Sequence, residues 1–191
     1  QTLVMPWTAS LKDLISTEYP GLLGNRLHKE YAPFFPRHYR VRRTPKEALN
    51  DILYLEKLRH EKSVQFSLVP FIFDSSVYSA KVSLLTIYSK EKIELIKVMP
   101  ILQYLGLFVY DELTPRVWAT AVLIGYLHRF RVKDKHGNLI DNGDFPQLIQ
   151  DILKQVFENR TENDPTNELV INAQLNWRTI NLVQTYRNLM L

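Results

Sequence analysis

The acidic pair Asp111-Glu112 is the most suggestive candidate for chemistry in the sequence, because it ends the apolar stretch that covers residues 99–110. Acid–base catalysis by two carboxylates requires both groups in one site, in environments that separate their pKa values. Successive side chains of a β-strand point to opposite faces of the sheet. If this stretch is a strand, the two carboxylates do not share a site, and solvated acids at a strand end are the favoured interpretation.

Other residue types that support catalysis are absent or unsuitably spaced. The chain has no cysteine, which excludes thiolate nucleophiles, disulfides and cysteine-ligated metals. None of the five histidines pairs with another at metal-ligand spacing, and His128 lies in an apolar stretch typical of a sheet. None of the six glycines forms G-x-G-x-x-G or a P-loop. We therefore expect no catalytic, metal or cofactor-binding residue in this chain.

A basic stretch, RHYRVRR at residues 37–43, is the one candidate for a nucleic-acid contact. Its four arginines could follow a phosphate backbone. The net charge of the whole chain is only +4, however, with 24 Lys and Arg against 20 Asp and Glu. An exposed linker is the favoured interpretation, and nucleic-acid binding is kept as an alternative.

Local signals then place helices at both ends of the chain. Thr44, Pro45 and Glu47 have the spacing of a capping box with proline in the first turn, which predicts a helix start. Towards the other end, helix starts are predicted at Asp144, Asp164 and Asn176, each of which precedes an apolar helical pattern.

The middle of the chain reads strand, strand, helix, strand, strand, helix. Residues 64–73 and 80–89 are rich in β-branched and aromatic types, and Pro70 predicts that the first is an edge strand. Gly106 ends the following helix as a residue with positive φ. Two more strands are predicted up to residue 132, as a hairpin around Thr114-Pro115. This order is the split βαβ pattern of a ferredoxin-like α+β sandwich, with the helices at 92–105 and 144–160 on one face.

The expected domain organisation has three parts. Residues 1–45 form a helical and extended lead-in, residues 46–160 the α+β domain, and residues 161–191 the start of a helical domain. The chain begins with Gln and stops inside a helical pattern, which we interpret as a piece of a longer protein. No stretch of about eighteen apolar residues predicts a transmembrane helix.

Four stretches of the sequence resemble the large bacterial NAD-specific glutamate dehydrogenases. They are EYAPFFPRHYRVRRTPKEALNDILYLEKL, KVSLLTIYS, VMPILQYLGLFVYDE, and ENRTENDPTNELVINAQLNWRTINLVQTYRNLML. Their order and spacing agree with the family over most of residues 31–191. Eight positions are selected as family motif residues: Gly106, Asp111, Glu112, Asn163, Asp164, Asn167, Trp177 and Arg178.

The resemblance implies an ACT-like α+β domain within a regulatory or scaffolding fragment that lies ahead of the catalytic region. The parent enzyme would convert L-glutamate and NAD to 2-oxoglutarate and ammonia, with NAD bound outside this fragment. The implied partners are the remaining domains of the same polypeptide, in a homo-oligomer. We expect a cytoplasmic protein that contacts neither nucleic acid nor membrane.

An amino-acid-sensing ACT module is the main alternative. Ligand-binding ACT domains generally carry a glycine in the loop after the first strand, and the corresponding loop here, SKEKIE, has none. Close approach of this backbone to a bound amino acid is therefore harder. Nucleic-acid binding is the further alternative, with Arg40, Arg42 and Arg43 as its candidate residues.

Overall fold

The computed structural model describes residues 6–74, 79–119, 123–141 and 143–190. The chain divides by its contacts into two compact units. The helical unit contains Gln1–Lys62 together with Val117–Gly125, and the α/β unit contains Ser63–Arg116 together with Tyr126–Leu191.

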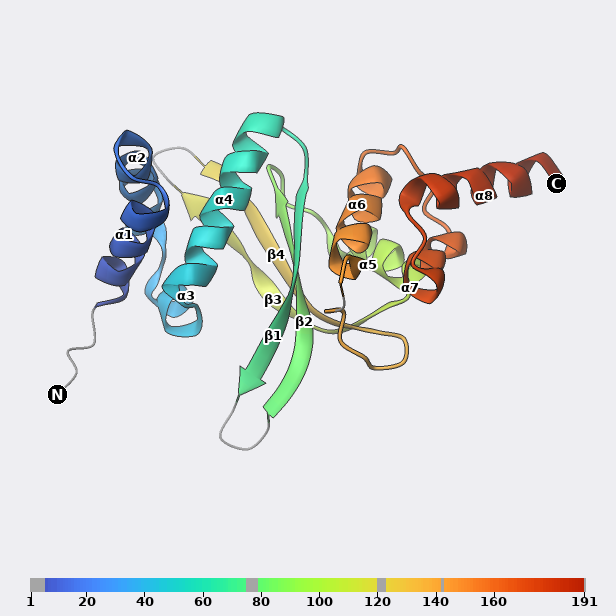
Figure 1. The fold of residues 1–191 in the computed structure, drawn as a ribbon, viewed down its shortest axis with the longest axis horizontal. Helices are drawn as coiled ribbons and strands as arrows, with labels where there is room; N and C mark the ends of the chain where they lie inside the picture. The colour runs from blue at the N-terminus through green and yellow to red at the C-terminus, as the bar shows by residue number, and fades with distance from the viewer. Residues whose placement is uncertain (1–5, 75–78, 120–122, 142, 191) are drawn as a thin grey trace. The chain divides into compact units, whose positions relative to one another are not determined.

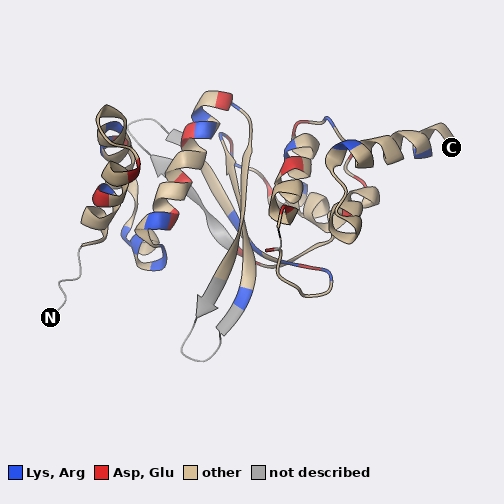
Figure 2. Ribbon diagram, viewed as in Figure 1, with Lys and Arg blue, Asp and Glu red and all other residues tan. Residues whose placement is uncertain are grey.

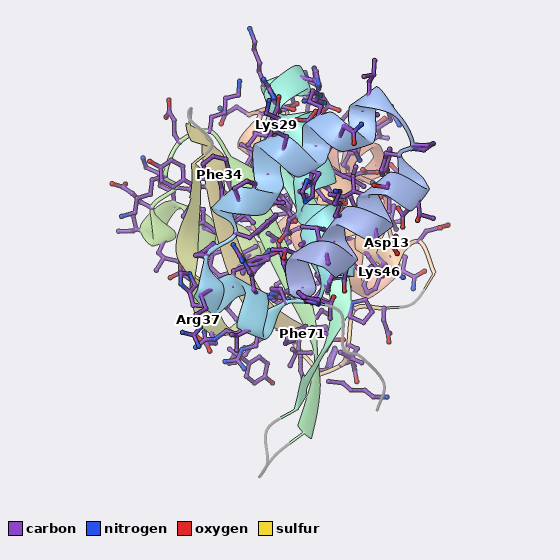
Figure 3. The ribbon with its side chains drawn as sticks, turned by 90° about the vertical axis from the view of Figure 1, so that its left-hand side faces the viewer. Asp13, Lys29, Phe34, Arg37, Lys46 and Phe71 are labelled. Carbon is purple, nitrogen blue, oxygen red and sulfur yellow. The ribbon has the colours of Figure 1, made fainter. Side chains whose placement is uncertain are left out.

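The helical unit is built from short helices whose boundaries follow local sequence signals. A capping box fixes the start of its longest helix: Thr44 accepts from the Glu47 backbone, and the Glu47 side chain accepts from the Thr44 backbone. Helix α1 packs against α2 and α4, as Figure 3 shows from the side that carries Asp13 and Lys29. The elements are α1 (Trp7–Glu18), α2 (Leu22–Tyr31), the 3₁₀ turn η1 (Ala32–Phe34), α3 (Arg37–Arg42) and α4 (Pro45–Glu61).

Helix α3 covers residues 37–42 of the basic stretch, so the predicted linker is wrong, although four of the six side chains in α3 are exposed as predicted. Tyr39 is buried and its ring stacks on Phe35, at 4.7 Å between centroids. The guanidinium of Arg40 donates to the carbonyl of Phe35, and Arg43 forms an ion pair with Glu47. Burial of an aromatic ring thus orders a segment that its charge alone would leave in solvent.

The α/β unit is a four-stranded sheet in the order β1-β2-β4-β3, with α5 and α6 on one face (Figure 1). Strand β2 pairs antiparallel with both β1 and β4. The path β2-α5-β3 passes over β4, which is the split βαβ unit of the predicted ferredoxin-like fold. The elements are β1 (Gln65–Asp74), β2 (Ser79–Ser89), α5 (Leu95–Tyr104), β3 (Leu107–Ala119), β4 (Leu123–Asp134), α6 (Phe145–Phe157), the 3₁₀ turn η2 (Pro165–Glu168), α7 (Leu169–Ala173) and α8 (Trp177–Met190).

One apolar core joins the sheet to its helices. Alternate strand residues such as Leu85 and Phe130, which are paired in the register, meet Leu102 of α5 and Ile152 of α6. Pro70 lies in β1, at the edge of the sheet, as predicted. An edge position suits it because proline has no N–H and cannot donate a ladder hydrogen bond.

One local prediction in this unit is wrong. Strand β3 continues through Thr114-Pro115 to Ala119, so the hairpin does not turn there. The connection at residues 120–122 lies outside the described residues. Helix α6 begins directly after Asp144, as predicted, although the Asp144 side chain makes no capping hydrogen bond. Asn176, in contrast, caps α8 by accepting from the backbone N–H of Thr179 at 3.1 Å.

The contact-based units also differ from the predicted domain boundaries. Helix α4 belongs to the helical unit rather than to the α+β domain, and residues 161–191 group with the sheet. Helices α7 and α8 both contact α6, which explains the second difference. The three-part division stays a prediction about which parts fold independently.

Candidate functional site

Gly106 is the point where three segments of the α/β unit come together. Its φ is +73°, and its N–H donates to the carbonyl of Gln103 at 2.9 Å. A Cβ at this position would lie 2.9 Å from Cγ of Glu168, in the η2 turn. Glycine is therefore required twice here, by the backbone conformation and by the close approach of another segment.

Glu168 is held in this position by the end of β4. Its Oε1 accepts from Nζ of Lys135 at 2.5 Å. This hydrogen bond is the main reason that the pKa of Glu168 is lowered from its usual value. The contact fastens the η2 turn across the junction between α5 and β3.

The next motif residue, Asn167, is the centre of a buried amide network. Its side chain is fully buried, and its Nδ2 donates to the carbonyl of Glu162 at 2.9 Å. Its Oδ1 accepts from Nε2 of Gln184, which is 1% exposed, at 2.9 Å. Breaking a hydrogen bond between two buried amides is costly, because each amide is then left with neither a protein partner nor a water molecule to bond to. The network ties α8 to the loop before η2.

A charged rim surrounds the amide network. Asp164 accepts from the backbone and hydroxyl of Thr166, and Arg187 reaches both Asp164 and Glu162 at 3.0 and 3.1 Å. Burial alone would raise the pKa of Asp164. The hydrogen bonds from Thr166 and Arg187 outweigh burial, so the pKa lies below the usual value. Asp164 therefore stays ionised at neutral pH, and the rim supports the same attachment of α8.

The remaining motif residues of this segment have smaller roles. Trp177 packs against the apolar core, and the guanidinium of Arg178 lies 4.9 Å from the centroid of its ring. Asn163 is exposed. The structure thus gathers Gly106, Asp164, Asn167 and Trp177 around one junction, which we call the α8 junction.

Asp111 and Glu112 lie elsewhere and have different partners, as the alternation of a strand predicts. Asp111 forms an ion pair with Arg131. Oε1 of Glu112 lies 3.8 Å from Nδ1 of His128. Nε2 of His128 accepts from the backbone N–H of Ile93 at 3.3 Å, so the neutral imidazole carries its proton on Nδ1. Burial lowers the pKa of His128 and raises that of Glu112.

The helical unit has its own charged cluster, centred on Glu56. This carboxylate accepts from Arg26 at 2.5 Å and from the hydroxyl of Tyr31 at 2.7 Å. Burial alone would raise its pKa, but these bonds lower it. An open groove of about 600 Å³ lies beside the cluster, between α2 and α4. Arg26 and Glu56, which line the groove, are already paired with each other.

Among the residues that the structure describes, no group of three or more His, Cys, Asp or Glu could hold a metal ion. In that same part of the chain, no helix is long and apolar enough to cross a membrane.

Sequence reasoning missed Glu168, Gln184 and Arg187 as members of the α8 junction. One available signal was the spacing of Gln184 and Arg187, which places both on one face of a helix.

Comparisons with known proteins place both units in one family. Residues 14–58, within the helical unit, match the model of glutamate dehydrogenase helical motif 2. Residues 75–145, which contain β2 to β4, match the model of the glutamate dehydrogenase ACT3 domain. Both matched stretches are thus similar to parts of glutamate dehydrogenases. The α+β unit of the chain is accordingly an ACT-type domain with the ferredoxin-like fold.

Relatives in this family are much longer than the chain. It is 25% identical over 181 residues to the NAD-specific glutamate dehydrogenase of Pseudomonas aeruginosa, and 23% identical over 177 residues to that of Halomonas elongata. These matches cover 94% and 91% of the chain but only 11% of each relative. The chain therefore spans about one tenth of the length of these curated relatives.

Proposed function

We propose that the chain is a non-catalytic regulatory and scaffolding region of an NAD-dependent glutamate dehydrogenase. The whole protein would oxidise L-glutamate to 2-oxoglutarate and ammonia with NAD as the acceptor. The observation that carries this proposal is the match of two successive family models to the two units, over one tenth of the relatives' length. The NAD site would lie in the other parts of the polypeptide.

The side-chain contacts support a scaffolding role. Two of the acidic groups that could serve as acids or bases are paired within the fold: Asp111 with Arg131 and Glu56 with Arg26. Asn167 and Gln184 fasten α8 to the sheet unit. Such contacts give a rigid body whose surfaces other domains can use.

The test uses the longest natural polypeptide that contains this segment. We expect it to reduce NAD in the presence of glutamate, and a version that lacks residues 161–191 to assemble less well because the α8 junction is missing. Native mass spectrometry and NADH absorbance are measured on both versions. Absence of glutamate-dependent NAD reduction in the intact polypeptide would contradict the proposed activity, and unchanged assembly after the deletion would contradict the scaffolding role.

A second candidate, sensing of an amino acid, is favoured by the ACT3 match. The loop between β2 and α5 would be the place of closest backbone approach. Here it is held from inside, since Ser89 donates to the carbonyl of Glu91 and His128 accepts from Ile93. A thermal-shift titration against a panel of amino acids separates the two candidates: one amino acid that raises Tm supports a sensor, and a flat response supports a scaffold.

A further inference from the structure

Helix α8 carries an apolar face that no described residue covers. Five side chains make up this face, which we call the α8 stripe: Leu182, Val183, Tyr186, Leu189 and Met190, with exposures of 54%, 37%, 62%, 77% and 86%. On the other side of the same helix, Ile180 and Gln184 are buried. One side of α8 is thus buried against the α/β unit, and the opposite side exposes apolar side chains to solvent.

The spacing of the α8 stripe is that of a helix-packing surface. Leu182, Tyr186 and Leu189 follow each other at i, i+4 and i+7, so they form one ridge along the helix. With 3.6 residues per turn, the five side chains fall within an arc of about 120°. Figure 2 shows the same helix almost free of charged residues. A helix that is apolar on opposite sides is normally buried on both.

The charges of α8 argue against a membrane surface as the occupant. A helix that lies on a membrane carries several Lys or Arg on its polar face. Helix α8 has Arg178 and Arg187, and Arg187 is paired with Asp164 and Glu162. An amphipathic helix of another protein segment fits better, because a ridge at i, i+4 and i+7 packs into the groove of a partner helix.

The size of the α8 stripe favours a partner in the same polypeptide over a second copy. Stable association of separate chains buries about 1,200–2,000 Å² in total, whereas the 14 residues of α8 extend over only about 21 Å. A contact this small persists when both sides belong to one chain, because linkage gives a high effective concentration. The matched relatives provide such a chain, since this segment is 11% of their length.

We propose that the α8 stripe docks an apolar helix from a part of the polypeptide outside this segment. The proposal rests on the proposed function in one respect, namely that the segment belongs to a glutamate dehydrogenase-sized protein. It assigns the contact between this region and the remaining domains to α8 and to a helix-in-groove partner.

The test is site-specific photocrosslinking in the longest natural polypeptide that contains this segment. Benzoylphenylalanine is incorporated in place of Tyr186 or, as the matched control, in place of Thr185, which is exposed on the same turn but off the α8 stripe. After irradiation, the crosslinked peptides are mapped by mass spectrometry. We expect position 186, but not position 185, to crosslink within one polypeptide to apolar residues of another helix.

Two other crosslinking results would overturn the proposal. A crosslink between two polypeptides would assign the α8 stripe to a second copy. Equal crosslinking yields at positions 186 and 185 would show that no partner docks specifically on the α8 stripe. A double variant, Leu182→Gln with Leu189→Gln, gives an independent reading by hydrogen exchange: the partner helix should lose protection, whereas Thr185→Gln should change nothing. NADH formation in the same samples tests the proposed activity separately, since docking is read without catalysis.

Discussion

The helical unit and the α/β unit fasten a helix through different central groups, a carboxylate in the first and an amide pair inside a charged rim in the second. In the helical unit, the ionised Glu56 joins α4 to α2 through Arg26 and Tyr31. In the α/β unit, the neutral amides of Asn167 and Gln184 join η2 to α8. The carboxylate cluster is partly open to solvent, whereas the amide pair is almost completely buried.

This difference determines how each unit should respond to conditions. An ion pair that water reaches is screened by salt and loses its charge at low pH. A buried amide pair has no charge to lose, so pH and salt leave it intact. Its strength lies in the cost of leaving either amide unpaired inside the protein. Variants in the two units should therefore differ in how the loss of unfolding free energy depends on salt and pH, as well as in the size of that loss.

The largest effect is expected for Gly24→Ala in the helical unit. A Cβ at Gly24 would overlap the carbonyl oxygen of Tyr19, and backbone atoms have little freedom to move away. We expect the free energy of unfolding to fall by about 3 kcal/mol or more, because α1 and α2 must separate. Urea unfolding measures this, and a loss below about 1 kcal/mol would contradict it.

Gly106→Val should have the next largest effect, in the α/β unit. Both the positive φ and the contact with Glu168 oppose a β-branched side chain. We expect a loss of about 2–3 kcal/mol, of which the backbone strain is about 1–2 kcal/mol. Gly137→Val is the matched control, since its φ is +82° and nothing lies within 4 Å. Equal losses for both variants in urea unfolding would show that the contact with Glu168 contributes nothing.

Asn167→Ala tests the buried amide network directly. The change leaves Nε2 of Gln184 without one acceptor and the carbonyl of Glu162 without one donor. We expect a loss of about 2 kcal/mol that is the same at low and high salt. A double-mutant cycle with Gln184→Ala measures the coupling between the two amides. Additive losses would mean that the hydrogen bond between them does not hold α8.

Sequence reasoning succeeded where the signal is local. The capping box of Thr44 and Glu47, the cap at Asn176 and the end of a helix at Gly106 all depend on residues a few positions apart. The richness of residues 64–73 and 80–89 in β-branched and aromatic types likewise predicted the first two strands. The order of the predicted elements gave the split βαβ path.

The α8 junction could not be predicted in the same way, because its contacts join distant positions. Gln184 meets Asn167 across 17 residues, and Lys135 meets Glu168 across 33. The helix at residues 37–42 depends on the burial of Tyr39, which its basic neighbours conceal in the sequence. The turn expected at Thr114-Pro115 was a local signal that pairing in the sheet overrode.

Glu56→Gln should produce a smaller loss that depends on salt and pH. We expect about 1–2 kcal/mol at low salt, because the ion pair with Arg26 is partly exposed. The pKa of Glu56 is lower in the folded chain. Its contribution is therefore complete above the unfolded-state pKa of about 4.3 and disappears as the pH falls through the folded-state value. In urea unfolding at rising salt concentration, the free energies of unfolding of the original protein and of the variant should converge. A difference that stays constant with salt would contradict the ion-pair account.

The smallest effect is expected from His128, and it falls in a different pH range. Burial lowers the pKa of His128 in the folded chain, where the ring is 1% exposed. The neutral ring accepts a hydrogen bond from the backbone N–H of Ile93. The charged groups that face it are Glu112, 3.8 Å away, and Lys92, which lowers the pKa further. The unfolded chain thus takes up a proton first as the pH falls, so stability declines below about 6.5.

His128→Gln should flatten the decline in stability between about pH 6.5 and 5, by less than about 1 kcal/mol. Gln can still accept from Ile93, so the variant removes the titration while it keeps the contact. His28→Gln in the helical unit is the matched control, since burial and Lys12 also lower the pKa of the less buried His28. If His28→Gln flattens the decline in stability more than His128→Gln does, the acid sensitivity above pH 5 belongs to the helical unit. That result would contradict the assignment of this sensitivity to His128 in the α/β unit.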